Sequence, residues 1–140
     1  AAHMIDTGFF VGEQYVRAGY RGYYDVDFIV SKTGQLYVTE SNIRRTGATH
    51  VYTLARQLFG PDFMHETYTL SNNGYSLPRS FTFKELSTTL SPILYNYHTK
   101  QGLIIASQNL LSQNVLAYTI FAPTRARALA LEQQLDQLLK

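Results

Sequence analysis

Carboxylates lie within or directly after two neighbouring segments of this 140-residue sequence that are rich in β-branched and aromatic residues. These segments are residues 24–31 and 35–39, and Lys32-Thr33-Gly34 between them has the composition of a turn. The pattern predicts a β-hairpin. The polar side chains of interest are Asp25, Asp27, Glu40 and Asn42. Because successive side chains point to opposite faces of a strand, those of each strand share one face.

A loop over residues 32–35 would fix the pairing of the two strands. The expected pairs are Ser31 with Leu36, Ile29 with Val38, Asp27 with Glu40, and Asp25 with Asn42. Apolar residues then meet near the turn, and the acids meet at the open end of the hairpin.

The expected pairing of Asp27 with Glu40 is unfavourable, because like charges directly opposite on a sheet repel. A cation would remove that cost. Mg²⁺ suits the site because it prefers oxygen ligands and is often completed by substrate phosphates. Arg44 and Arg45 follow at once and suit phosphate or carboxylate ligands. A hairpin whose acids simply pair with these arginines fits the pattern equally well.

The spacing resembles the metal-binding signature of ATP-grasp enzymes. Asp27 stands thirteen positions before Glu40, Asn42 follows two later, and Arg44 two after that. The longer string from Glu40 to His50 resembles a segment of the pheganomycin-type peptide ligase branch. The resemblance covers residues 5–62, and the remaining tail is similar to that branch's C-terminal extension only loosely.

The resemblance implies roles for these residues. Asp27, Glu40 and Asn42 would hold Mg²⁺ (or Mn²⁺) ions that bridge the phosphates of ATP. Arg44 would contact the transferred phosphoryl group or an acyl phosphate, as the catalytic residue. The expected substrate-site residues are Arg45, Thr49 and His50. Family members activate a carboxylate with ATP, and an amine then attacks the acyl phosphate, so small carboxylates and amines are the expected substrates.

The features of the earlier nucleotide-gripping lobe are absent from the sequence. It has no Gly-rich phosphate loop and no pair of strand-borne lysines; its lysines are Lys32, Lys84, Lys100 and Lys140. We therefore expect a truncated part of a longer ligase, inactive by itself, whose partners include the missing N-terminal lobes. Sequence upstream of Ile5 would test this. Residues 1–4, Ala-Ala-His-Met, have the composition of a cloning scar.

The expected fold class is α+β. Residues 5–62 are assigned to the later ATP-grasp lobe, with a helix from Asp6 or Thr7 to Ala18, the hairpin, and a helix from Thr46 or Gly47 to Gly60. Residues 63–140 are assigned to an α+β extension. Its expected elements are a strand over residues 64–70, a turn at 71–74, a helix capped by Thr82, an antiparallel pair at 102–111 and 115–121, and a last helix with an apolar stripe of Leu129, Leu131, Leu135, Leu138 and Leu139.

Composition excludes several classes of protein. The chain has no cysteine, which rules out disulfides and thiolate metal sites and agrees with a cytoplasmic location. Its net charge is +2 and its basic residues form no stripe, which argues against nucleic-acid binding. No apolar run has the length of a membrane span.

Two other functions fit the same residues. An ATP-grasp kinase would phosphorylate a hydroxyl without an acyl phosphate, and hydroxamate trapping distinguishes it from a ligase. A non-enzymatic binding domain would retain the acids without using them. A homo-oligomer is compatible with each function.

Overall fold

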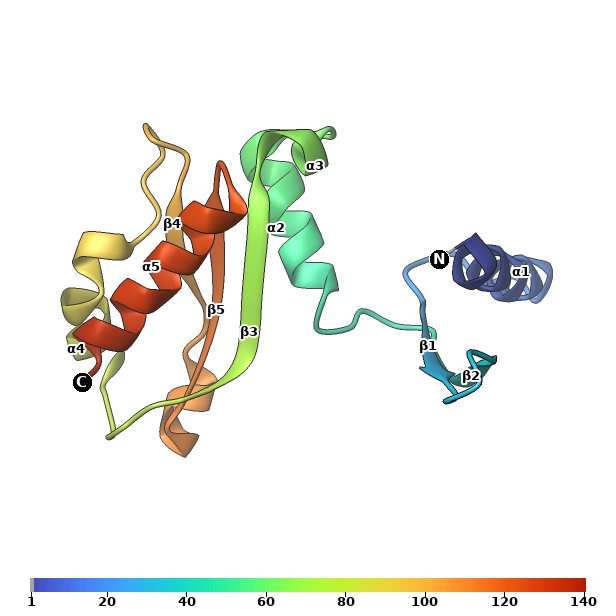
Figure 1. The fold of residues 1–140 in the computed structure, drawn as a ribbon, viewed down its shortest axis with the longest axis horizontal. Coiled ribbons are helices and arrows are strands. Elements are labelled where there is room, and N and C mark those ends of the chain that lie inside the picture. The colour runs from blue at the N-terminus through green and yellow to red at the C-terminus, as the bar shows by residue number, and fades with distance from the viewer. Residues whose placement is uncertain (1) are drawn as a thin grey trace. The chain divides into compact units, whose positions relative to one another are not determined.

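The computed structural model describes residues 2–140 and has the expected α+β class, with helices beside two small antiparallel sheets (Figure 1). Contacts divide the chain into two compact units, and the division falls in the sequence between Tyr52 and Thr53. This division lies inside a helix, ten residues before the domain boundary set from the sequence. The later part of that helix belongs to the second unit, because Phe59 packs there against Tyr95 and Phe121.

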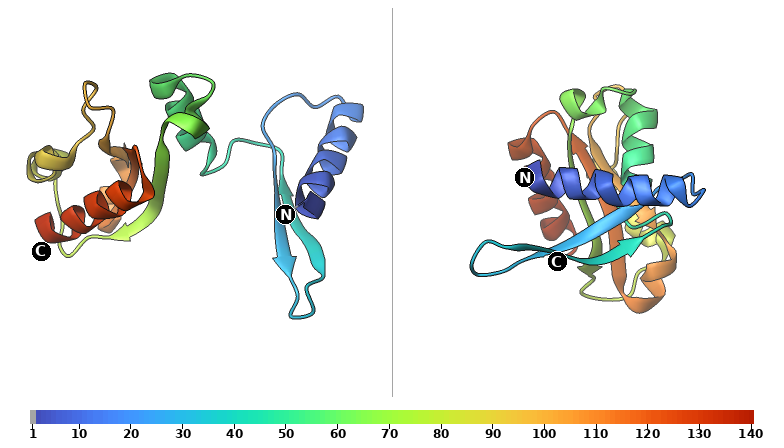
Figure 2. Two further views of the ribbon diagram at one scale, coloured as in Figure 1. Left: turned by 45° about the horizontal axis from the view of Figure 1, so that its top comes forward. Right: turned by 90° about the vertical axis from the view of Figure 1, so that its right-hand side faces the viewer.

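The first unit contains helix α1 (Ala2–Arg17), strands β1 (Asp25–Val30) and β2 (Leu36–Asn42), and the first turn of α2 (Thr49–Phe59). The strands form the predicted antiparallel hairpin, and α1 lies along it (Figure 2). Gly19 follows α1 with a φ of 88°, a left-handed conformation that glycine adopts without strain and that ends helices.

Helix α1 begins earlier than the sequence predicted. Thr7 was expected as a cap, but its hydroxyl donates to the carbonyl oxygen of His3 one turn back, at 2.8 Å, so it lies inside the helix. Residues 2–4 of the suspected cloning scar are helical, and residue 1 lies outside the described residues. The start of the second helix was also misplaced by a few residues, since α2 begins at Thr49.

Polar and aromatic contacts join α1 to the hairpin. The Tyr24 hydroxyl donates to the Gly8 carbonyl at 3.0 Å, and the Tyr15 hydroxyl donates to Ser41 Oγ at 2.6 Å. The Tyr15 and Tyr24 rings meet edge to face, with centroids 5.6 Å apart. No apolar side chain within residues 2–52 is buried, so this unit lacks a hydrophobic core of its own.

The second unit is built on a three-stranded antiparallel sheet in the order β3-β5-β4. Its strands are β3 (Tyr68–Ser76), β4 (Gly102–Ser107) and β5 (Val115–Ala122). Its helical elements are α3 (Phe63–Glu66), α4 (Phe83–Thr89), η1 (Ser91–Ile93), η2 (Asn109–Gln113) and α5 (Arg125–Leu138). One face of β5, with Leu116, Tyr118 and Ile120, packs in the core with leucines of α4 and α5.

The sequence predicted the β4–β5 pair and the Thr82 cap of α4, and the strand expected over residues 64–70 overlaps only the start of β3. The expected turn at residues 71–74 is wrong, because β3 continues through it as a β-bulge beside β5. Asn72 Oδ1 accepts the Gly74 N–H at 2.8 Å and so satisfies part of the backbone that leaves the ladder. Leu129 was expected in the buried stripe of α5 but is 37% exposed, and Ala128 is buried instead.

Candidate metal and nucleotide site

The acidic end of the hairpin has the predicted register. Asp27 pairs with Glu40, and Asp25 pairs with Asn42. Directly opposite residues share a face, so all four side chains lie on one face of the hairpin, named here the carboxylate face.

The pairing near the turn differs from the prediction, because a β-bulge follows the Asp27–Glu40 pair. Thr39 is the extra residue, and its hydroxyl donates to the Asp27 carbonyl oxygen at 3.2 Å. The observed pairs toward the turn are Phe28 with Val38, Ile29 with Tyr37, and Val30 with Leu36. Our expected pairs Ser31–Leu36 and Ile29–Val38 are therefore wrong.

Helix α1 lies on the other face of the hairpin. Ser41 stands between Glu40 and Asn42, so its side chain points away from theirs. Its Oγ accepts the Tyr15 hydroxyl of α1 and donates to the Asp25 carbonyl oxygen at 3.1 Å. Within the first unit, α1 thus leaves the carboxylate face uncovered.

The two pairs of the carboxylate face differ in exposure. Asp27 and Glu40 are exposed, whereas Asp25 and Asn42 are half-buried. One carboxylate oxygen of Asp25, Oδ1, has less than 1 Å² of accessible surface and no hydrogen-bond partner. A buried oxygen without a donor is costly, by about 1–3 kcal/mol or more for a charged group.

Arg44 lies beside the predicted ligand Asn42. One guanidinium nitrogen, Nη2, donates to Asn42 Oδ1 at 3.1 Å, and Nη1 donates to the Arg45 carbonyl at 3.3 Å. Arg45 instead holds its guanidinium over the Tyr23 ring, 5.7 Å from the centroid. Across residues 2–140 the one ion pair is Arg17–Glu13, so the alternative in which the acids pair with these arginines is not observed.

The remaining predicted substrate residues lie at the start of α2. Thr49 is its first residue and is buried, and its Oγ1 accepts the Thr46 N–H at 3.0 Å, a capping arrangement. His50 is the next residue and is exposed. Both residues belong to the start of α2 and not to the strands that carry the carboxylate face.

The oxygen donors of the carboxylate face have the chemistry that a hard divalent cation prefers. They belong to two neighbouring cross-strand residue pairs of the hairpin. Among residues 2–140, no three Asp, Glu, His or Cys side chains converge on one point. An ion would therefore take the two carboxylates of Asp27 and Glu40 and the amide oxygen of Asn42, with water or phosphate completing its shell.

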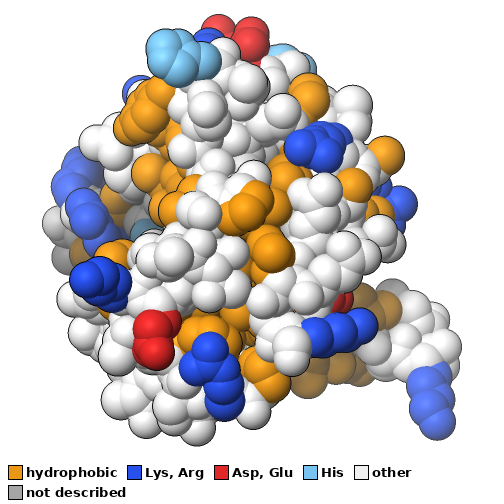
Figure 3. Space-filling view, turned by 90° about the vertical axis from the view of Figure 1, so that its left-hand side faces the viewer, with side chains coloured by type: hydrophobic (Ala, Val, Ile, Leu, Met, Phe, Trp, Pro, Cys, Tyr) orange, Lys and Arg blue, Asp and Glu red, His pale blue; other side chains and the backbone are white. Residues whose placement is uncertain are grey.

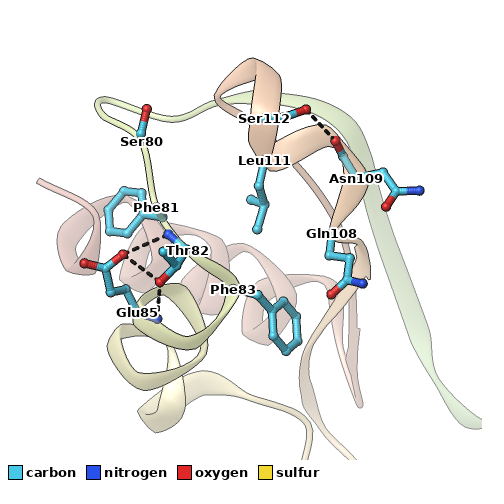
Figure 4. A pocket seen from close by; sticks show the side chains of 9 residues that line it. All are labelled: Ser80, Phe81, Thr82, Phe83, Glu85, Gln108, Asn109, Leu111 and Ser112. Carbon is cyan, nitrogen blue, oxygen red and sulfur yellow. Dashed lines mark hydrogen bonds between the residues drawn. The ribbon is translucent and has the colours of Figure 1, made fainter.

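A cavity of about 770 Å³ in the second unit has no connection with the residues predicted from the sequence. It lies between the start of α4 and η2, with Phe83 and Leu111 among its walls (Figure 4). Thr82 and Glu85 on its rim form a reciprocal helix cap. Their hydrogen bonds lower the pKa of Glu85, which explains this carboxylate as a structural group.

Two tyrosine–carboxylate pairs join the sheet of this unit to α5. The Tyr118 hydroxyl donates to Glu132 at 2.5 Å, and the Tyr75 hydroxyl donates to Asp136 at 2.7 Å. The pKa of both tyrosines is raised, and that of Tyr75 reaches about 12. Burial is the largest cause, and the hydrogen bond to the carboxylate is the next. These pairs were not predicted from the sequence. The one indication was that Glu132 and Asp136 stand four residues apart on the last helix, so that they share a helix face.

Basic side chains are spread out on the face shown in Figure 3, with neutral and apolar groups between them. No helix in the described part of the chain is both long and apolar enough to cross a membrane. Neither a protein-family model nor a curated protein matches the chain. The geometry of the hairpin therefore provides the basis for a functional proposal.

Proposed function

We propose that the chain is part of an ATP-dependent carboxylate–amine ligase, of the ATP-grasp kind, that forms amino-acid or peptide amides in the cytoplasm through an acyl phosphate. One observation carries the proposal. The register aligns Asp27 with Glu40 on the same face as Asn42, and Arg44 reaches that face.

The chain's own residues have defined tasks in this proposal. Asp27, Glu40 and Asn42 supply the oxygen ligands for Mg²⁺, which neutralises phosphate charge when it is bound. Arg44 stabilises negative charge on the transferred phosphoryl group, since an exposed guanidinium matches phosphate geometry. In the structure the Arg44 guanidinium donates a hydrogen bond to Asn42 Oδ1. Binding of an ion to Asn42 and of a phosphate nearby would therefore turn the guanidinium toward the phosphate.

Burial supports the idea that this unit belongs to a larger lobe. Phe9, Phe10, Ile29 and Val30 are each more than half exposed, and no apolar side chain of residues 2–52 is buried. A helix and one hairpin do not form a stable core by themselves. By this account the isolated chain binds ATP weakly and has no ligase activity.

Isothermal titration of the 140-residue chain with Mg²⁺·ATP checks that statement, and tight binding would contradict it. In the longer protein, hydroxamate trapping of an activated acid separates a ligase from a kinase. Glu40→Ala and Asn42→Ala are expected to abolish trapping, whereas Asp62→Asn, at an exposed position without a side-chain cap bond, is the matched control. Normal ligase activity in the Glu40→Ala enzyme would overturn the assignment.

A non-enzymatic binding domain is the second candidate, and a specific observation favours it. Arg44 already donates to Asn42 Oδ1, the atom that a metal would need. If hydroxamate never forms in the longer protein and Mg²⁺ does not bind, this second function replaces the first.

A further inference from the structure

The cavity between the start of α4 and η2 lies wholly within the second unit, because all the residues that line it fall between positions 80 and 112. Its volume of about 770 Å³ is in the range of small-molecule sites, which is roughly 300–1,000 Å³. The cavity is therefore large enough to hold a ligand without any contribution from the hairpin.

Hydrogen bonds tie the loop before α4 to the end of η2, so the two walls of the cavity are fixed relative to each other. Asn114, which follows η2, accepts the Leu77 N–H on its carbonyl oxygen at 2.8 Å and the Ser80 hydroxyl on Oδ1 at 2.7 Å. Thr82 and Glu85 then cap the start of α4. A site whose walls are fixed before binding loses less entropy when a ligand enters.

One polar side chain of the cavity is free to bind a ligand. The hydroxyls of Ser80, Thr82 and Ser112 already donate hydrogen bonds to other groups of the same unit. The Asn109 side chain points away from the cavity (Figure 4). The Gln108 carboxamide points into it and makes no hydrogen bond within the described chain. It therefore offers a free donor and a free acceptor.

Phe83 and Leu111 give the cavity its apolar surface. Figure 4 shows both side chains and that of Gln108 pointing toward a common space. Phe83, the first residue of α4, is 49% exposed. The other lining ring, Phe81, is covered by the Arg79 guanidinium, 3.8 Å from its centroid. Phe83 is thus the aromatic ring available to a ligand.

The cavity carries no positive charge that could receive an anion. None of its lining residues is Lys, Arg or His, and the one carboxylate among them belongs to Glu85. That carboxylate accepts the Thr82 N–H at 2.8 Å and the Thr82 hydroxyl at 2.7 Å, and it turns away from Leu111 and Phe83 (Figure 4). Phosphates and carboxylates are therefore disfavoured, and the cavity suits an uncharged ligand.

We propose that this cavity binds an uncharged peptide segment through one apolar residue. The apolar side chain lies against Phe83 and Leu111, where burial of its surface favours binding. The backbone of the same residue pairs with the Gln108 carboxamide, because a peptide group presents one donor and one acceptor and a carboxamide presents both in return. The proposal is independent of the function proposed for the hairpin.

The test titrates the isotope-labelled 140-residue chain with N-acetyl-leucine amide, an uncharged blocked amino acid, and follows the backbone amide signals by NMR. We expect saturable shifts at Phe83, Gln108 and Leu111. Gln108→Met keeps the length of the side chain and removes both hydrogen-bonding groups, so it should weaken binding roughly tenfold, the equivalent of about one net hydrogen bond. Gln113→Met, at an exposed position of η2 outside the cavity, is the matched control and should bind as the unaltered chain does.

Phe83→Ala, which removes the exposed ring, should weaken binding in the same titration. The absence of shifts in the unaltered chain, or shifts centred outside the cavity, would overturn the proposal, as would equal affinities of Gln108→Met and Gln113→Met. Equal binding of N-acetyl-aspartate amide would contradict the uncharged class of ligand. Tighter binding of adenine than of the blocked leucine would make the cavity a nucleobase site and not a peptide site.

Discussion

Single carboxyl groups in this protein have different roles because their surroundings differ. Asp27 and Glu40 face each other in water, Asp25 has a buried oxygen without a donor, and Asp136 accepts a hydrogen bond from the Tyr75 hydroxyl. Asp27 and Glu40 have the opposed charges that a bound cation would offset, because like charges directly opposite on a sheet repel. Asp136 is explained by the tyrosine alone.

The Tyr75–Asp136 pair predicts a dependence of stability on alkaline pH. Burial, then the bond to Asp136 and its charge, raises the pKa of Tyr75 to about 12, above the ordinary value near 10. The folded state therefore favours the protonated phenol. This contribution to stability is fully present below about pH 10 and is lost as the pH rises toward the folded pKa.

Asp136→Asn should lower the Tyr75 pKa toward 10 but leave it above that value, because burial is the largest cause and remains. NMR of isotope-labelled tyrosine rings through an alkaline titration measures this, with Asp62→Asn as the control. An unchanged Tyr75 titration in Asp136→Asn would show that the carboxylate has no part in the shift.

At the scale of elements, the contact of α1 with the hairpin depends on a glycine. A Cβ built on Gly12 would overlap the Tyr24 hydroxyl and ring, whereas one on Gly8, in the same helix, meets nothing within 4 Å. Tyr24 would have to turn and give up its hydrogen bond to Gly8.

Gly12→Ala is therefore expected to destabilise the first unit by about 1–2 kcal/mol, through the lost contact and hydrogen bond. Gly8→Ala is expected to stabilise it by about 0.5–1 kcal/mol, since alanine favours the helix. Circular dichroism during thermal unfolding compares the two variants. Equal shifts in both would mean that α1 does not pack on Tyr24 in solution.

The elements also show where sequence reasoning succeeds and where it ends. Local signals predicted the hairpin, the end of α1 near Ala18, the end of α2 near Gly60, and the Thr82 cap of α4. The bulge at Thr39 was not predictable, because its cause is a pairing choice between strands, which no local propensity specifies. The same holds for the second half of β3, whose Asn72-Asn73-Gly74 segment has the composition of a turn but is held in the strand by pairing with β5.

At the scale of the whole chain, the two units differ in the burial that stabilises them. The second has a core of leucine and aromatic side chains, whereas no apolar side chain of residues 2–52 is buried. Hydrophobic burial is the main favourable term in folding. The second unit is therefore expected to be the more stable part.

A chain of residues 49–140, which keeps α2 whole, should unfold cooperatively by itself. A chain of residues 2–48 should show no cooperative transition, since a helix and one hairpin bury too little apolar surface. Differential scanning calorimetry of both measures this. A sharp transition in the short chain would contradict the account of the first unit as part of a larger lobe.

The carboxylate face as a divalent-cation site is the central claim, and residue-resolved paramagnetic broadening tests it most directly. Sub-stoichiometric Mn²⁺ is added to the isotope-labelled 140-residue chain, and the loss of each backbone amide signal is recorded. The account predicts that broadening centres on Asp27, Glu40 and Asn42 and disappears when excess Mg²⁺ competes. Broadening centred on Glu132 and Asp136 of α5, or spread evenly over the chain, would contradict it.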